Sequence, residues 1–434
     1  MPTDTMPRSP ARILIITNTV SQLIGKIFTM LATLLATFLI AGTFGPQGYG
    51  DFTKATAYVA LFYLLTDFGL NAIFVRDTDR DPAISIGNLL SLRLAISAVL
   101  VFCAIALTVF LPGSGTDGFT AWVKLGIILY TPTILFQSVT TTGNAVFQKS
   151  LRYGRSALAV ATGGLVTLIA VYLIARIIRP EVALYWLVSA YAAGSLVTSL
   201  ISISLSEIRL RDIAESSWRS MYMFIRRAIP FGLTLVVNVI YFRADILIIS
   251  LTRPTAEVGL YGLAYRFFEV PLVIPTFFMN SVYPLLTAGG SDSADRRHLI
   301  RPLLLKSSGI MLPASLIVLV AGFYASGILA FIRTDFVPSI PALKVLLLGM
   351  PAFFLSSVTM WSMVALGKQK QLLATYGSVM LLNITANLIF IPRFSFMAAA
   401  WVTVVSEFLI LIISIFMLRK WLFPGRAGKG TGDN

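Results

Sequence analysis

Charged residues are scarce in this chain. They make up 12% of its 434 residues, whereas ordinary soluble proteins contain about 25%. Hydrophobic residues account for 57% of the chain, and its mean hydropathy is +0.84. A soluble globular protein is therefore excluded.

Cysteine and histidine are nearly absent, with one residue of each. Cys103 lies in an apolar run, so neither an intramolecular disulfide nor a cysteine-based metal site can form. His298 is flanked by arginines and belongs to no catalytic motif. The chain also lacks a G-x-x-x-x-G-K-[ST] phosphate loop and a G-x-S-x-G nucleophile motif. The sequence therefore predicts no enzyme activity, catalytic residue, cofactor or metal site.

Long apolar runs are what the chain does have. A membrane-crossing helix needs about 20 such residues, and runs of this kind recur along almost the whole sequence. The predicted fold class is an all-α integral membrane protein with twelve transmembrane helices. The predicted spans are 13–44, 52–75, 88–111, 121–147, 157–177, 183–205, 229–251, 258–286, 304–331, 340–366, 372–391 and 396–418.

Positive charge is spread unevenly over the predicted loops. The net charge of +15 would suggest nucleic acid as a partner of a soluble protein, but in a membrane protein it first indicates topology. Most of the 34 Lys and Arg residues fall in the tails and even-numbered loops. The positive-inside rule then predicts that both termini are cytoplasmic. No nucleic-acid partner is expected.

The two halves of the chain resemble each other weakly. Pro46 and Pro254 differ in number by 208, and Gly50-x-Phe52 and Gly259-x-Tyr261 differ by 209. This echo predicts a duplicated six-helix unit, arranged as parallel repeats about an axis along the membrane normal. The expected division is an N-terminal half (1–206), a cytoplasmic linker (207–228), a C-terminal half (229–418) and a cytoplasmic tail (419–434). Chance recurrence of Gly, Pro and aromatic residues at helix ends is the alternative.

Cations inside the predicted spans are the main functional signal, because a charge near the bilayer centre costs about 2.5–3.5 kcal/mol on insertion scales. Lys26 shares one face of the first span with Asn18 and Gln22, at i, i+4 and i+8. Arg243 and Arg266 lie in spans seven and eight. We expect these side chains to face a cavity, where they could bind an anionic ligand.

Acidic residues in the same spans offer a second interpretation. Asp245 lies close to Arg243 in sequence, and Glu269 follows Arg266 at i+3, a spacing that permits an ion pair. Such pairs could simply join helices. Asp67 is a candidate partner of Lys26. Alternatively, Asp67, Asp245 and Glu269 could carry a coupling ion.

Several short segments resemble a known family. The run from Phe44 to Phe52 (FGPQGYGDF), the segment from Leu65 to Asn71 (LTDFGLN) with Arg76, the triplet Arg243-Ala244-Asp245 and the run from Val258 to Tyr261 are similar to segments of the polysaccharide and O-antigen-type oligosaccharide flippases. These proteins belong to the multidrug/oligosaccharidyl-lipid/polysaccharide exporter superfamily. The twelve-span plan covers nearly the whole chain.

The resemblance implies a flippase of the bacterial inner membrane. Its cargo would be an undecaprenyl-pyrophosphate-linked oligosaccharide, moved from the cytoplasmic to the periplasmic leaflet by alternating access. Lys26, Arg243 and Arg266 would then bind the pyrophosphate, since Arg and Lys are the usual phosphate partners. Membrane lipids, and a glycan polymerase and glycosyltransferases of the same pathway, would be its partners.

Two other functions remain open from the sequence. A multidrug/cation antiporter of the same superfamily is the nearest alternative, although its first helix would be expected to carry an acidic residue where this chain has Asn18, Gln22 and Lys26. A membrane enzyme of envelope glycan assembly is the third. It would need a cluster of catalytic side chains in a sizeable aqueous loop, and every predicted loop is short.

Overall fold

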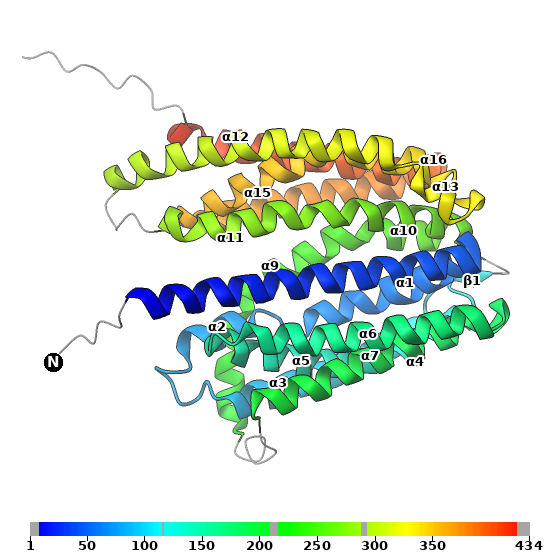
Figure 1. The fold of residues 1–434 in the computed structure, drawn as a ribbon, viewed down its shortest axis with the longest axis horizontal. Coiled ribbons are helices and arrows are strands. Elements are labelled where there is room, and N and C mark those ends of the chain that lie inside the picture. Colours follow the sequence, from blue (N-terminus) through cyan, green and yellow to red (C-terminus); the bar gives the residue numbers. More distant parts are fainter. Residues whose placement is uncertain (1–7, 115–116, 209–215, 288–292, 423–434) are drawn as a thin grey trace, which may run out of the picture. The chain divides into compact units, whose positions relative to one another are not determined.

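The computed structural model describes residues 8–114, 117–208, 216–287 and 293–422, and nearly all of them are helical (Figure 1). The chain separates into two compact units, residues 1–259 and 260–434. Each unit is described by itself. Short strands β1 (Gly113–Ser114) and β2 (Asp117–Gly118) form an antiparallel pair in the first unit.

The first unit is a helical bundle. Its helices are α1 (Arg8–Leu65), α2 (Leu70–Asp77), α3 (Ile86–Thr108), α4 (Ala121–Tyr130), α5 (Pro132–Lys149), α6 (Tyr153–Ile177), α7 (Ala183–Ser206) and α9 (Trp218–Thr252), with a 3-10 turn at Pro180–Val182. Helix α10 (Thr255–Glu269) begins in this unit and continues into the next.

A buried apolar cluster holds the ends of four helices in this bundle together. Leu70 and Phe74 of α2 pack with Leu89 of α3, Ala145 of α5 and Phe224 of α9. Burying a large apolar side chain stabilises a fold by about 1.5–3 kcal/mol. The cluster therefore fixes α2, α3 and α5, which carry the polar site described below, against α9.

The second unit contains the remaining helices. They are α11 (Val273–Thr287), α12 (Ser293–Ala325), α13 (Ile328–Ile332), α14 (Ser339–Leu348), α15 (Met350–Ala365) and α16 (Gln369–Leu422), with 3-10 turns at Val270–Leu272 and Thr334–Phe336. The turn at 270–272 contains Pro271 and separates α10 from α11. Proline lacks the amide proton that a continuous helix needs there, so predicted span eight is broken at this point.

Two helices are long enough for two crossings each. Non-helical residues interrupt them, Gly45 in α1 (φ 66°, ψ −173°) and Ser395 in α16 (φ 61°, ψ −162°). In the described residues, nine helices are long and apolar enough to cross a membrane, and the bent pair α14–α15 makes a tenth. Counting α1 and α16 twice gives the twelve predicted crossings, and the protein is a multi-pass membrane protein.

The predicted division of the chain into two halves, a linker and a tail stays a prediction. Helix α9 begins at Trp218, so the last part of the predicted linker, 218–228, is helical. This helix packs against α1, α2 and α3, which places it in the first unit. The middle of that linker (209–215) and most of the predicted tail (423–434) lie outside the described residues.

Candidate functional site

Predicted span two is interrupted at residues 66–69, and this break contributes Asp67 to a polar site. Helix α1 ends at Leu65 and α2 begins at Leu70. Between them Phe68 (φ 40°) and Gly69 (φ 74°) adopt positive φ values, which end a right-handed helix. Asp67 then lies at the start of α2, where its Oδ1 accepts the amide of Asn71 at 3.4 Å. The break thus turns a carboxylate into the bundle.

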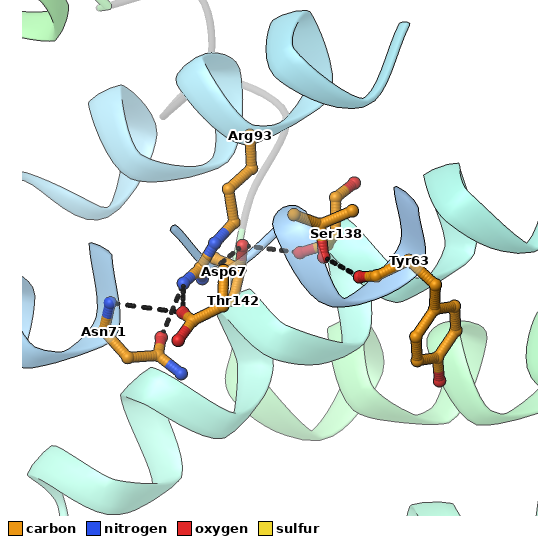
Figure 2. Close-up of polar contacts among 7 residues, drawn as sticks. Tyr63, Asp67, Asn71, Arg93, Ser138 and Thr142 are labelled. Carbon is orange, nitrogen blue, oxygen red and sulfur yellow. Dashed lines mark hydrogen bonds and ion pairs between the residues drawn. The ribbon is translucent and has the colours of Figure 1, made fainter. Parts of the chain in front are cut away.

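Arg93 of α3 completes this site (Figure 2). Its Nη2 donates to Asp67 Oδ1 at 2.6 Å and to Asn71 Oδ1 at 2.7 Å. Its Nη1 donates to Thr142 Oγ1 of α5 at 3.2 Å. One guanidinium therefore joins α2, α3, α5 and the break that follows α1. We call these four residues the Arg93 site.

The two charged groups of the Arg93 site differ in accessibility. The Arg93 side chain is fully buried, whereas about a third of the Asp67 side chain, 32%, is exposed. Arg93 Nε is buried with no hydrogen-bond partner. A buried arginine that lost its carboxylate would be an uncompensated charge. Arg93 is therefore fully enclosed at this site, whereas part of the Asp67 side chain is accessible.

A second buried cation, Lys54, lies after the kink in α1. Its Nζ donates to the carbonyl oxygen of Gly118 in β2 at 2.6 Å and to the hydroxyl of Thr255 at the start of α10. Lys54 and Thr255 are both fully buried. Their bond joins two segments of the first unit that are 201 residues apart in sequence.

The three cations predicted to bind an anion have different environments. Lys26 of α1 is exposed on the first unit, and Arg243 of α9 is half-buried. Arg266 of α10 forms an ion pair with Glu269, with 3.2 Å between Nη1 and Oε2. More than a third of the Arg266 side chain, 37%, stays exposed, so the pair leaves it accessible. A shared cavity for the three remains a prediction.

The other predicted residues are placed as follows. Asp245 of α9 is buried, and its Oδ1 accepts the amide of Ile246 at 2.7 Å. Asp67, a candidate partner of Lys26, forms an ion pair with Arg93. The side chains of Asn18 and Gln22 lie outside the described residues, although both positions are helical in α1.

Sequence reasoning missed Arg93, Lys54 and a buried carboxyl in the second unit. Glu407 of α16 accepts a hydrogen bond from Ser356 of α15. Nearby in the same helix, Asn383 donates to Ser406 at 2.9 Å. One signal in the sequence could have revealed Arg93. Arg93 lies a few residues inside predicted span three, and Asp67 lies a few residues before the end of predicted span two. The two side chains are therefore expected at a similar depth in the membrane, where they could form an ion pair.

The sequence matches a known family. A family model described as "Polysaccharide biosynthesis protein" matches residues 15–289, which is more than half of the chain. A search of curated proteins finds no match.

Solved structures with a similar fold are membrane transporters and flippases. The lipid II flippase MurJ in an inward closed conformation has a TM-score of 0.72 at 16% identity, over 92% of this chain and 87% of that chain. An inward-facing multidrug resistance transporter of the MATE family has a TM-score of 0.72 at 14% identity, over 93% and 98%.

A third structure is a MOP-superfamily transporter from Pyrococcus furiosus. It has a TM-score of 0.60 at 15% identity, over 94% of this chain and 96% of that chain. That transporter is described as having a binding pocket of reverse polarity, which suggests a different function for it. At these identities the likeness concerns the fold. The chain belongs to the polysaccharide biosynthesis protein family, and it has the twelve-helix fold of the transporters and flippases of the MOP superfamily.

Proposed function

We propose that the protein flips a polyprenyl-pyrophosphate-linked oligosaccharide across the bacterial inner membrane for surface polysaccharide export. The observation that carries this proposal is the family match over residues 15–289 in a chain that has the fold of a transporter or flippase. The cargo moves from the cytoplasmic to the periplasmic leaflet by alternating access. Both termini face the cytoplasm, as the distribution of Lys and Arg indicates.

The cargo has three parts with different requirements. A glycan that entered hydrocarbon would lose its hydrogen bonds to water, which is costly, so it needs a hydrated path between helices. The polyprenyl tail can remain in lipid. The pyrophosphate needs cations, and we assign this role to Lys26, Arg243 and Arg266. Asn18 and Gln22, on the same face of α1 as Lys26, would hydrogen-bond the polar part of the cargo.

Three acidic residues, Asp67 in the break after α1, Asp245 of α9 and Glu269 of α10, are proposed to carry the coupling ion. Asp67 suits this role best, because a third of its side chain is exposed while its partner Arg93 is sealed. Protonation of Asp67 would weaken its charge-assisted bond to Arg93. Asp245 and Glu269 are the further candidates. The lipid-linked oligosaccharide and membrane lipids are the direct partners. The glycan polymerase and glycosyltransferases of the same pathway are the further partners.

The pyrophosphate role predicts the effect of removing each cation. A hydrogen bond to a charged group contributes about 1.5–3 kcal/mol, so Lys26→Ala, Arg243→Ala and Arg266→Ala should each lower flipping about tenfold or more. Flipping is measured as surface glycan in cells and as transfer of the lipid-linked oligosaccharide in proteoliposomes. Arg176→Ala is the matched control, because Arg176 stacks on Tyr172 at the end of α6 and has no assigned role.

Two results would contradict the proposal. Wild-type transfer in all three variants would exclude the pyrophosphate role. Sensitivity of a deletion strain to cationic drugs, together with normal surface glycan, would identify an antiporter instead. In the variant that combines Arg266→Ala with Glu269→Ala, flipping should stay low, since the loss comes from the missing cation rather than from an unpaired carboxylate.

A further inference from the structure

A pocket lies at one end of the first unit, where α2 and α5 end and α3 begins. Its volume is about 550 Å³, and ligand pockets in proteins typically measure about 300–1,000 Å³. Its walls come from within residues 74–86, which include the loop between α2 and α3, and from within residues 146–150 at the end of α5. We call it the Lys149 pocket. It is large enough to hold part of an organic ligand.

One side of the Lys149 pocket is apolar and fixed in place. Phe74 and Ile84 line the pocket and belong to the buried cluster that joins α2, α3, α5 and α9. Ile86 and Val146 also line it and pack against that cluster. Because the cluster holds these four side chains, the apolar side does not need a ligand in order to form. A preformed apolar wall of this kind favours a ligand with a hydrocarbon part.

The opposite side of the pocket carries a cation and a hydroxyl group. Lys149 Nζ lies 6.0 Å from the centroid of the Phe74 ring, so the ammonium is next to the apolar wall. The Oγ of Ser85 accepts the amide of Asn88 at 3.2 Å, which leaves the hydroxyl hydrogen of Ser85 to donate to a ligand. The pocket therefore matches a ligand with an anionic head and an apolar tail.

The ion pair of Lys149 shows which kind of group its ammonium accepts. Asp79 Oδ1 lies 2.6 Å from Lys149 Nζ, so an oxyanion fits at this distance. The Asp79 side chain is 78% exposed, and an exposed ion pair contributes little to stability. A phosphate oxygen can therefore take the place of this carboxylate at small cost.

The Lys149 pocket lies at the depth of the lipid headgroups. Both α3, which begins at Ile86, and the segment that ends at Lys149 are long and apolar enough to cross a membrane. Their ends mark the boundary between hydrocarbon and water, where lipid phosphates lie. Exposed arginines at the same end of the first unit add positive charge, and such residues attract anionic lipids. They are Arg80 of the loop, and Arg219 and Arg226 of α9.

We propose that the Lys149 pocket binds an anionic phospholipid of the surrounding membrane. The phosphate bonds Lys149 and Ser85 in place of Asp79, and the upper part of one acyl chain covers the apolar side. A lipid bound in this way contacts the α2–α3 loop and α5 together. It therefore holds α2, α3 and α5 at the end of the bundle, in addition to the bonds of the Arg93 site. No part of this inference depends on the identity of the cargo.

Binding is measured on the purified full-length protein in detergent, by native mass spectrometry and by thermal unfolding with added lipid. We expect phosphatidylglycerol to bind about fivefold more tightly than zwitterionic phosphatidylcholine. It should also raise the unfolding temperature, since a ligand of the folded state stabilises that state. Glycerol 3-phosphate, which has no acyl chain, should bind far more weakly. Equal binding of the two lipids, or equally tight binding of glycerol 3-phosphate, would overturn the proposal.

Two substitutions should act in opposite directions if the pocket holds a phosphate. Lys149→Gln removes the cation and should weaken phosphatidylglycerol binding about tenfold. Asp79→Asn removes the competing carboxylate and should strengthen binding about twofold. Lys370→Gln is the matched control, because Lys370 is an exposed lysine at the start of α16. A structural role of the ion pair alone predicts the same loss in both pocket variants, and that result would overturn the proposal.

Competition distinguishes a membrane phospholipid from the lipid carrier of the proposed cargo. Undecaprenyl pyrophosphate is added to the wild-type protein in an amount equal to phosphatidylglycerol, and the bound lipid is identified by its mass. We expect phosphatidylglycerol to stay bound. Its displacement by the carrier would assign the pocket to the cargo and overturn this proposal, while the flippase function would stand.

Discussion

Arg93 and Lys54 are both fully buried cations in the first unit, and they differ in what faces them. Arg93 bonds a carboxylate, an amide oxygen and a hydroxyl on α2, α5 and the break that follows α1. Lys54 bonds only a carbonyl oxygen and a hydroxyl. The comparison teaches that burial alone does not define a role: Arg93 is neutralised by a carboxylate, whereas the hydrogen bonds of Lys54 go to neutral oxygens.

Removal of the Arg93 side chain is the strongest test of this comparison. Arg93→Ala leaves Asp67 without its counter-ion, and breaking a buried pair in this way costs about 3–5 kcal/mol. The variant should lose most of its folded, monodisperse protein in detergent, measured by size-exclusion chromatography and thermal unfolding. Asp67→Asn leaves Arg93 as a buried charge without its carboxylate and should cost at least as much. Equal stability of Arg93→Ala and the wild type would show that the site does not join the helices.

Two glycines that lie against backbone should give the next largest effect. A Cβ atom added to Gly50 would lie 2.1 Å from the carbonyl oxygen of Thr255, and one added to Gly259 would lie 2.0 Å from that of Pro46. Gly50→Ala and Gly259→Ala therefore each force a backbone oxygen to move, and overpacking of this kind costs about 1–3 kcal/mol, measured as a loss of thermal stability. Gly164→Ala in α6 is the control, since a Cβ there meets nothing within 4 Å. Wild-type stability of both variants would contradict these close approaches.

Replacing Lys54 should have the smallest effect on stability. Lys54→Met keeps the length of the side chain and removes a charge that is costly to bury, but it also removes the donor to the Gly118 carbonyl oxygen and the Thr255 hydroxyl. Because these two effects oppose each other, we expect a shift of about 1 kcal/mol or less in unfolding free energy, measured by thermal unfolding. Destabilisation as large as that of Arg93→Ala would make Lys54 a fixed structural group, and the contrast between the two cations would disappear.

The helical fold follows closely from sequence, because it depends on a local property. Apolar run length predicts the crossings, whereas the break between Leu65 and Leu70 lies inside a span that was predicted to be continuous. Partners across helices are harder to predict. The pairing of Asp67 with Arg93, and of Lys54 with Thr255, depends on which helix faces each side chain. The hydropathy pattern indicates how deep a residue lies in the membrane, but it does not indicate which neighbouring helix the side chain faces.

The repeat shows the same limit. The spacing of Gly50 and Gly259 predicts a duplication, yet equal spacing cannot reveal that the equivalent residues meet. That information lies in the packing of α1 against the start of α10. The proposed roles of Lys26, Arg243 and Arg266 likewise remain predictions, because they depend on a cargo and on the placement of helices from both units.

The abrupt joints at Gly45 and Ser395 carry a mechanical consequence. A single non-helical residue separates the two arms of α1, and another separates the two arms of α16. In each long helix the angle between two membrane crossings is therefore set mainly by the φ and ψ of one residue, Gly45 in α1 and Ser395 in α16.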